Sequence, residues 1–346
     1  MTVSNALVGQ DDESDSSDQM RAIAQSEYGG PEKLSLQTVP RPTPQNNDVL
    51  VQIYAASLNA GDWHLMRGQP LFIRPMFGGV FKPRIRTLGY DMAGIVEAIG
   101  PDVTQFQPGD AVFGDLSECG FGAFAEYVCA PELALVLKPE TVSFEVAAAV
   151  PGSALAALQG LRDVGQIQPG QRVMINGASG GVGSLAVQLA KGFGAEVTAV
   201  CSPQKMEMVR SLHPDHIVDY TQTDVTQTGQ RYDLIFDAAA YRSITDYLPA
   251  LTTGGTYVLV GGGGTQFLQG MVLGPLISKI SGRRVTYLAT QPNQADLLTV
   301  RDLLTAGKIA PYIGQRYDLS EVSQAIRHLE ARQVQGKAVI RVLPAE

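Results

Sequence analysis

The stretch GQRVMINGASGGVGSLAVQLAKGFGAEVTAVCS, residues 170–202, decides the fold of this chain. It opens with the short apolar run Arg172–Asn176 and continues into a glycine-rich turn. Small and apolar residues then recur at helical spacing from Val182 to Ala190. Gly192 and Gly194 end that helix, and a second strand begins at Val197. This order predicts one strand–helix–strand unit of a parallel, doubly wound sheet.

The turn itself reads Ala178-Ser179-Gly180-Gly181-Val182-Gly183, a dinucleotide-binding fingerprint with alanine in its first glycine position. Small residues let the main chain approach a pyrophosphate, and the helix N-terminus that follows attracts an anion. An ordinary strand–helix turn is the alternative. The strand before the turn and the helix and strand after it all lie where the fingerprint needs them. The stretch therefore predicts a nucleotide-binding site.

The end of the second strand favours NADPH over NADH. An Asp or Glu at this place would hold both ribose hydroxyls of NAD. No carboxylate lies between Glu196 and Glu207, and the strand ends in Cys201-Ser202-Pro203-Gln204-Lys205. A hydroxyl and an ammonium suit a 2′-phosphate, although a polar loop with a solvated lysine would look the same.

Composition limits the remaining possibilities. The chain has 346 residues, enough for two domains, and its net charge of −8 argues against a nucleic-acid surface. Three cysteines without a CxxC pair, and the lack of a signal peptide or bilayer-length apolar run, predict a cytoplasmic protein. Residues 1–19 carry five carboxylates and no Lys or Arg, which predicts a disordered acidic tail and argues against a transit peptide.

The rest of the chain divides into a β-rich part and an alternating part. Short strands at 21–25, 34–39 and 49–58, with Gly and Pro between later apolar runs, predict a small barrel-like domain. An alanine-rich helix over 144–161 leads to the alternating part, with further strands at 216–220, 232–237 and 256–260. A helix over 294–304 and a closing strand over 337–342 complete the chain.

Five motifs occur in a fixed order. They are NAGD at Asn59–Asp62, GYDMAGIV at Gly89–Val96, PGDAVFG at Pro108–Gly114, GASGGVG at Gly177–Gly183 and VDY at Val218–Tyr220. On these motifs the chain from Met20 to Leu343 resembles the medium-chain dehydrogenase/reductase superfamily, and within it the zinc-independent quinone oxidoreductases. Within that group the chain resembles chloroplast envelope quinone oxidoreductase homologues and alkenal- or enone-reducing enzymes.

The resemblance implies an α/β chain in which a GroES-like β-rich catalytic domain is interrupted by a Rossmann domain. The divisions are then a tail at 1–19, catalytic domain at 20–145, NADPH-binding domain at 146–290 and the remaining catalytic domain at 291–346. Nicotinamide and substrate would lie in the cleft between the domains. A homodimer formed near Val285–Ala289 is also implied.

Zinc-dependent members use a Cys, a His-Glu pair and a later Cys or Asp as catalytic ligands. Here the His-Glu place reads Tyr90-Asp91, the first-ligand region reads Asn59–Asp62, and the four-cysteine structural lobe is absent. A metal held by Asp62, His64 and Asp91 is an alternative, but zinc prefers nitrogen and sulfur ligands. We expect no metal.

Loss of zinc favours a conjugated acceptor, because its negative charge spreads over an enolate or hydroquinone that hydrogen-bond donors can stabilise. We therefore expect NADPH-dependent reduction of a quinone or of the C=C bond of an α,β-unsaturated carbonyl. Two alternatives remain: a zinc-type alcohol dehydrogenase, and a non-catalytic NADPH-binding sensor or structural protein on the same fold.

The resemblance assigns roles to individual residues. Asn59 would contact substrate or nicotinamide, Asp62 would shape the same wall, and Tyr90 would donate a hydrogen bond or a proton. Turn formation by Asn59 and Asp62, and packing by Tyr90, are the alternatives. Ser153 stands near the place where relatives carry a threonine. The cofactor residues would be Ser179, Gly180, Gly181 and Val182 at the pyrophosphate, Ser202, Lys205 and Tyr220 at the 2′-phosphate, and Gly261, Gly262 and Lys337 near the nicotinamide.

Two apolar segments, residues 71–77 and 267–280, are expected to set substrate size as mobile walls of the cleft. Protein core or a dimer surface is the alternative for both. A third interpretation is weak peripheral membrane contact, because Arg74, Lys82, Arg84 and Arg86 accompany aromatic residues.

Overall fold

The structure is a computed structural model that describes residues 18–77 and 79–343. Residues 170–202 form β8 (Arg172–Asn176), α5 (Gly181–Gly192) and β9 (Glu196–Cys201), as predicted. Four further parallel strands complete a six-stranded sheet in the order β10-β9-β8-β11-β12-β13. They are β10 (His216–Asp219), β11 (Tyr232–Asp237), β12 (Leu251–Leu259) and β13 (Arg284–Tyr287).

A second sheet, mostly antiparallel, holds the early strands and the last two. Its order is β14-β15-β3-β4-β5-β7, with β6 paired to β3. The strands are β3 (Asp48–Ser57), β4 (Asp91–Ile99), β5 (Ala111–Asp115), β6 (Tyr127–Pro131), β7 (Leu135–Leu137), β14 (Ile313–Asp318) and β15 (Lys337–Arg341). β1 (Gln19–Ala24) and β2 (Ser35–Pro40) form a separate hairpin-like pair.

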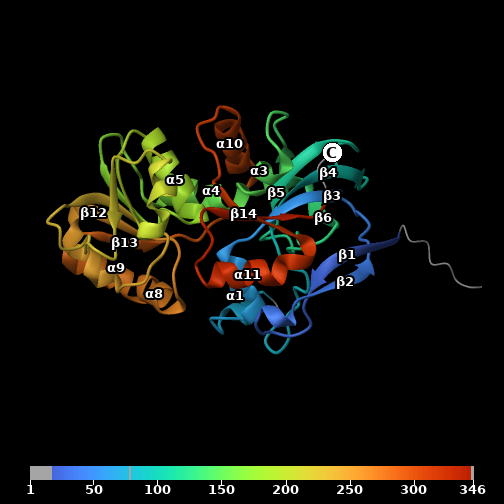
Figure 1. Cartoon of the computed structure of the whole chain (residues 1–346), viewed down its shortest axis with the longest axis horizontal. Coiled ribbons are helices and arrows are strands. Elements are labelled where there is room, and N and C mark those ends of the chain that lie inside the picture. The colour runs from blue at the N-terminus through green and yellow to red at the C-terminus, as the bar shows by residue number, and fades with distance from the viewer. Residues whose placement is uncertain (1–17, 78, 344–346) are drawn as a thin grey trace, which may run out of the picture.

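The end of the chain thus returns to the sheet in which its early strands lie, after crossing the parallel sheet (Figure 1). The predicted combination of a β-rich part with a doubly wound parallel sheet is confirmed. The predicted domain boundaries, between residues 145 and 146 and between residues 290 and 291, stay predictions. Of the predicted tail at 1–19, residues 1–17 lie outside the described residues, and β1 begins at Gln19.

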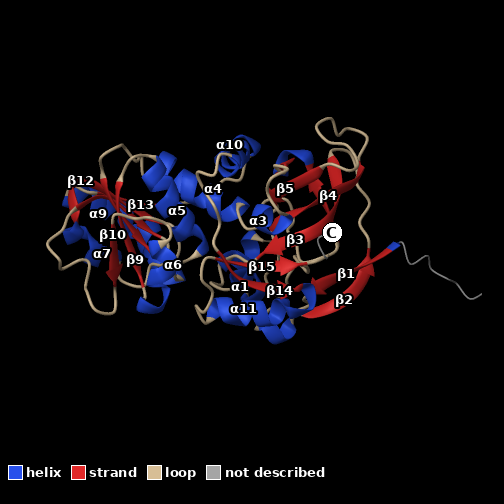
Figure 2. Cartoon of the chain, turned by 45° about the horizontal axis from the view of Figure 1, so that its top comes forward, coloured by secondary structure: helices blue, strands red, loops and turns tan. Residues whose placement is uncertain are grey.

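The helix predicted over 144–161 is wrong in its continuity. The structure has α3 (Phe144–Ala148) and α4 (Pro151–Gln159), followed by a π-helical turn at Gly160–Val164. Pro151 cannot continue a helix from the preceding turn, because it lacks an N–H and its ring clashes with the carbonyl four residues back. It therefore starts α4 instead. α4 lies between the two halves of the molecule in Figures 1 and 2 and packs against α5.

Several other elements are only partly predicted. α1 (Ala60–Arg67), α2 (Ile73–Met76), α6 (Met206–Arg210), α7 (Ile244–Tyr247), α8 (Gly264–Leu268), α9 (Gly274–Ser281), α10 (Gln294–Thr305) and α11 (Val322–Glu330) are the remaining α-helices of the described residues. Only α10 is predicted with nearly these bounds. β12 starts five residues before the predicted position, and the other strand ends differ by one or two residues.

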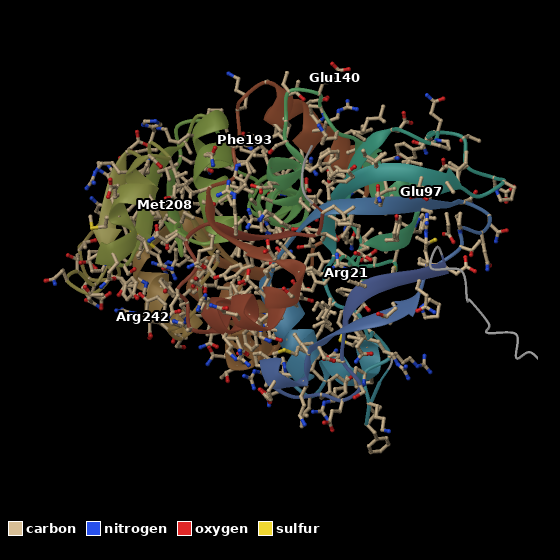
Figure 3. The ribbon with its side chains drawn as sticks, turned by 45° about the vertical axis from the view of Figure 1, so that its right-hand side comes forward. Arg21, Glu97, Glu140, Phe193, Met208 and Arg242 are labelled. Atoms are coloured by element: carbon tan, nitrogen blue, oxygen red, sulfur yellow. The ribbon has the colours of Figure 1, made fainter. Side chains whose placement is uncertain are left out.

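Each half has its own core. Residues such as Ile53, Met92 and Phe124 pack together under the antiparallel sheet. Val173, Leu185 and Phe236 belong to a second cluster between the parallel sheet and α4 and α5. In Figure 3, Arg21 and Glu97 lie on the first half and Phe193 and Met208 on the second.

Candidate functional site

A buried lysine stands where the two halves meet. Lys337, the first residue of β15, is 2% exposed. Its Nζ donates to Asn59 Oδ1 at 2.6 Å, to Asp91 Oδ2 at 3.1 Å and to Ser153 Oγ at 3.2 Å. These acceptors come from the residue before α1, from β4 and from α4. All three N–H groups of the ammonium therefore have a partner.

Asp91 is the centre of the same network. It is fully buried, and its Oδ2 also accepts the Asn59 Nδ2–H at 2.9 Å and the Ser57 hydroxyl at 3.2 Å. Its Oδ1 accepts the Gly152 N–H at 2.7 Å. A buried ion pair is tolerated only when further hydrogen bonds satisfy both charges, as they do here.

The network borders the glycine-rich turn. Gly336 donates its N–H to the Ser179 carbonyl at 2.8 Å, so β15 begins beside the turn. A Cβ added to Gly181 would lie 2.8 Å from Lys337 Cδ and 3.0 Å from Ser153 Oγ. Lys337 and Ser153 therefore reach the N-terminal end of α5, where the sequence predicts the cofactor.

The turn has the close packing that its sequence predicts. Gly177 has φ +77°, and a Cβ on Gly183 would lie 2.1 Å from the Gly177 carbonyl oxygen. Helix α5 can approach β8 this closely only with glycine at position 183. The free N–H groups at the start of α5 then face the space beside Gly180.

Asp62 lies near Lys337 and bonds main-chain groups around the network. It is fully buried, and its oxygens accept two main-chain N–H groups, from Asn59 at 2.8 Å and Gly89 at 3.0 Å. Burial raises the pKa of the Asp62 carboxyl to about 7, with a smaller contribution from the charge of Asp91. Asp62 thus fixes the main chain on both sides of the network rather than joining it.

Tyr90 packs over two glycines. A Cβ on Gly61 would lie 3.3 Å from its hydroxyl oxygen, and one on Gly152 would lie 2.9 Å from its ring. The ring meets Phe121 edge-on at 5.7 Å. Burial raises the pKa of the Tyr90 phenol well above its ordinary value, so its proton is held at neutral pH. His64 bonds the Gln69 carbonyl instead of joining these residues.

The predicted 2′-phosphate residues gather near the end of β9. Tyr220 donates its N–H to the Cys201 carbonyl at 3.3 Å, and Ser202 directly follows the strand. Lys205 Nζ donates to the carbonyls of Arg332 at 2.9 Å and Val334 at 2.7 Å. Burial lowers the pKa of Lys205, and the nearby positive charge of Arg332 lowers it further. Arg332, which the sequence analysis missed, thus adds a second cation.

Gly261 and Gly262 follow β12 and bring the main chain close to the loop after β11. A Cβ on Gly261 would lie 2.5 Å from the Ala238 carbonyl oxygen, and Gly262 has φ +149°. Val182 is the second residue of α5. Further from the turn, Tyr241 lies 5.5 Å from Tyr220 between ring centres, and Arg242 (Figure 3) pairs with Asp224 at 2.7 Å.

The residues around Lys337 do not fit a zinc ion. Asp62 and Asp91 offer only oxygen ligands, and main-chain N–H groups, an amide and an ammonium already occupy them. Lys337 brings a positive charge to the place where a metal would lie. Across residues 18–77 and 79–343, no group of three His, Cys, Asp or Glu side chains is arranged to hold a metal.

Besides Arg332, the sequence analysis missed the roles of Asp91 and Ser153 as partners of Lys337. A signal was available for the first. Lys337 opens the apolar strand KAVI, and a lysine in a buried strand needs a carboxylate nearby. Which carboxylate it meets depends on the pairing of β15 with β3, which sequence spacing does not reveal.

Two family descriptions match the chain. Residues 45–140 match the alcohol dehydrogenase GroES-like domain, and residues 212–340 match the zinc-binding dehydrogenase family. A tomato (Solanum lycopersicum) protein named 2-methylene-furan-3-one reductase is 32% identical over 94% of this chain and 80% of its own length. The chain belongs to the medium-chain dehydrogenase/reductase superfamily.

Other members of the superfamily agree with this assignment. The chloroplast envelope quinone oxidoreductase homologue of Arabidopsis thaliana is 31% identical over 94% of this chain and 98% of that protein. The solved structure of the Coxiella burnetii quinone oxidoreductase has a TM-score of 0.83 and 29% identity, covering 94% of this chain and all of the other. In the described part of this chain, no helix is long and apolar enough to cross a membrane.

Proposed function

We propose that this chain is an NADPH-dependent oxidoreductase that reduces a quinone or the C=C bond of an α,β-unsaturated carbonyl. The observation that carries the proposal is the buried Lys337–Asn59–Asp91–Ser153 network beside the glycine-rich turn. It places the Ser153 hydroxyl, which accepts a hydrogen bond from the Lys337 ammonium, as a donor at the place where the resemblance puts the nicotinamide. Relatives named as a furanone reductase, an NADPH-dependent alkenal/one oxidoreductase and quinone oxidoreductases support the same reaction class.

The cofactor site fits a dinucleotide with a 2′-phosphate. Ser179, Gly180, Gly181 and Val182 would hold the pyrophosphate, because a Cβ at Gly181 would close the space beside Lys337. Ser202, Tyr220, Lys205 and the adjacent Arg332 would face the 2′-phosphate. β9 itself ends without a carboxylate, and the nearest one, Asp219 of β10, pairs opposite Cys201 and accepts from Thr221. Gly261 and Gly262 would present main-chain groups to the nicotinamide.

Bound NADPH supplies a hydride. The chain's own contribution is to stabilise the negative charge that develops on the substrate oxygen. Ser153 accepts a hydrogen bond from Lys337, which strengthens its own hydroxyl as a donor toward the substrate. Asn59 and Asp91 hold the ammonium in place, and Asp62 fixes the main chain on either side. Tyr90 closes the wall over Gly61 and Gly152.

Oxidation of NADPH by the purified protein tests the proposal. A quinone, a short 2-alkenal and an aliphatic ketone are offered in parallel, with NADH as the control for the cofactor. We expect turnover of the quinone or the alkenal with NADPH, unchanged after exhaustive chelation. Turnover of the ketone that chelation abolishes would favour a zinc-type alcohol dehydrogenase. Tight NADPH binding without turnover of any acceptor would favour a sensor.

The segments expected as cleft walls, residues 71–77 and 267–280, remain part of this proposal, and we call residues 71–77, 79–81 and 268–280 the apolar rim. Many of its apolar side chains are exposed, for example Leu71 at 67%, Phe81 at 91% and Ile280 at 76%, whereas Ile73 and Ile277 pack partly against the protein cores. The residues that lead into the two segments lie side by side, because a Cβ on Gly264 would lie 3.1 Å from the Pro70 side chain. We propose that the rim borders the substrate site, with Arg74 and Lys82 able to add weak contact with an anionic membrane.

Assembly and location complete the proposal. We propose a homodimer in the cytoplasm, joined near β13, which is an edge strand of the parallel sheet. The N–H of Val285 is not available to a second strand, because it donates to the Ser278 hydroxyl at 2.8 Å. Strand pairing between two copies would therefore involve Tyr287 and the residues that follow. Cell fractionation tests the location.

A further inference from the structure

A second buried carboxyl group, that of Asp115, lies beside Asp91. Asp115 is the last residue of β5 and stands directly opposite Asp91 in the antiparallel pairing of β5 with β4. Directly opposite residues point to the same face of a sheet. A Cβ on Gly152 would lie 3.0 Å from Asp91 Oδ1 and 3.2 Å from Asp115 Oδ2. The two carboxylates therefore converge on one point at the start of α4.

The buried carboxyl groups around this point outnumber the buried cations. Asp62, Asp91 and Asp115 are 0%, 0% and 5% exposed, and Lys337 is the buried ammonium that faces them. The other titratable groups near Asp115 are Tyr90, Cys119 and the exposed Glu118. Three buried carboxylates beside one ammonium favour retention of a proton in the cluster.

The hydrogen bonds indicate which carboxyl keeps that proton. Asp91 accepts from Lys337, Asn59 and Gly152 and is therefore satisfied as a carboxylate, whereas both oxygens of Asp62 already accept main-chain N–H groups and face those groups rather than this point. Asp115 Oδ1 accepts the Ser117 N–H at 2.8 Å, whereas Oδ2 faces Gly152 and Asp91. Burial, followed by the charge of Asp91, raises the pKa of the Asp115 carboxyl to about 7.

Asp115 also reaches water by a separate route. It lines a cavity of about 180 Å³ together with Glu118, Cys119, Asn293 and Leu297. Residues of the glycine-rich turn do not line this cavity. Most of the lining is apolar, but Asp115, Glu118 and Asn293 add polar groups, and a cavity of this size has room for water molecules beside them.

We propose that Asp115 is a positioning residue that supplies the proton for the reduction, acting through Asp91 and Lys337. The proposal rests on the function proposed above. The Ser153 hydroxyl gives its proton to the reduced substrate and takes one from Lys337; Lys337 takes one from Asp91, and Asp91 from the Asp115 carboxylic acid. Each transfer breaks one O–H or N–H bond and forms another. Water in the cavity then returns a proton to Asp115, so one proton is consumed for each hydride.

Steady-state kinetics from about pH 6 to 9 tests this with the variants Asp115→Asn and Asp115→Glu. The matched control is Asp110→Asn, just before β5, whose carboxylate accepts only the Gln107 N–H among the contacts of the described chain. In the wild type, kcat is expected to fall above about pH 7 as Asp115 loses its proton. Asp115→Asn should lower kcat at pH 6 roughly 10- to 100-fold, without the pH dependence and with unchanged NADPH affinity. Asp115→Glu should restore the dependence at a shifted pH, and Asp110→Asn should match the wild type.

Infrared spectroscopy of the cofactor-free protein gives an independent result. Burial also raises the pKa of Asp62 to about 7, so the carbonyl band of protonated carboxylic acids that titrates near pH 7 in the wild type should lose the Asp115 component, and not disappear, in Asp115→Asn. Wild-type kcat at every pH in Asp115→Asn would overturn the proposal, as would equal losses of kcat, NADPH affinity and thermal stability. If Asp115→Asn does not fold, an unshifted pH dependence in Asp115→Glu overturns it. A wild type without turnover counts against the proposed function, and the infrared band still decides where the proton resides.

Discussion

At the scale of single residues, the site is organised by one buried ion pair. Lys337 and Asp91 are 2% and 0% exposed, and their nitrogen–oxygen distance is 3.1 Å. The sequence predicts that Lys337, Asn59 and the glycine-rich turn belong to the site. It does not predict that they share hydrogen-bond partners, because Ser57, Asp91 and Ser153 are brought together by strand register and by the break between α3 and α4.

Removing the charge of Lys337 should reveal the cost of leaving Asp91 unpaired. We expect Lys337→Met to lower the free energy of unfolding by about 3–5 kcal/mol, because a buried carboxylate then loses its cation. The double variant Lys337→Met/Asp91→Asn should recover most of that stability and none of the turnover. Urea unfolding and kcat measure the two effects. Equal stability of the single and the double variant would show that the charge of Asp91 does not depend on Lys337 for its stabilisation.

Asp62 should make the protein less stable as pH rises. Its folded pKa, about 7, lies above the unfolded value of about 3.9, so the folded state holds the proton more tightly. Its contribution is therefore full below pH 4 and is lost as pH rises toward 7, at up to about 1.4 kcal/mol per pH unit. Asp62→Asn should flatten the dependence of unfolding free energy on pH in this window. The exposed Asp102→Asn serves as control and should leave the slope unchanged.

At the scale of elements, the strand–turn–helix of residues 172–192 was the most predictable part of the chain, because its periodicity and its glycines agree. The α3–α4 break was not, although Pro151 signalled it. The helices α8 and α9 were also missed, and several of their apolar side chains, such as Leu268, Leu276 and Ile280, are exposed.

Two glycines of α5 provide a matched comparison. Gly183→Ala places a Cβ 2.1 Å from the Gly177 carbonyl oxygen, so the helix must move away from β8. We expect a lower melting temperature and weaker NADPH binding. Gly192→Ala, near the end of the same helix, has nothing within 4 Å and should stabilise the protein by up to about 1 kcal/mol. Differential scanning calorimetry checks both, and equal effects would refute the close packing of the turn.

At the scale of the whole molecule, the sequence predicts both sheets but not the exact membership of each. β14 and β15 share a sheet with β3. Lys337 therefore bonds Asn59, which lies 278 positions earlier in the chain. Contacts of that separation depend on the completed fold and leave no local pattern. The same holds for Asp115, which reaches the site only through its pairing with Asp91.

The proposed dimer can be tested at the outer edge of the parallel sheet. Leu288 donates its N–H to Leu259 at 2.8 Å, so the N–H of Tyr287 turns the other way, toward a second copy. Tyr287→Pro removes that donor and should give a monomer in sedimentation velocity. Tyr287→Phe keeps the N–H and should remain a dimer. A dimer that persists in Tyr287→Pro would place the interface elsewhere.

In the proposed mechanism, the buried network beside the cofactor turn carries the reduction. Asn59→Ala tests it most directly, because Asn59 bonds both Lys337 and Asp91 and contributes nothing to the predicted pyrophosphate or 2′-phosphate sites. NADPH affinity and kcat are measured on the same preparation. We expect Asn59→Ala to bind NADPH nearly as well as the wild type and to lose kcat by roughly 100-fold or more. Wild-type turnover in Asn59→Ala would contradict the proposed mechanism.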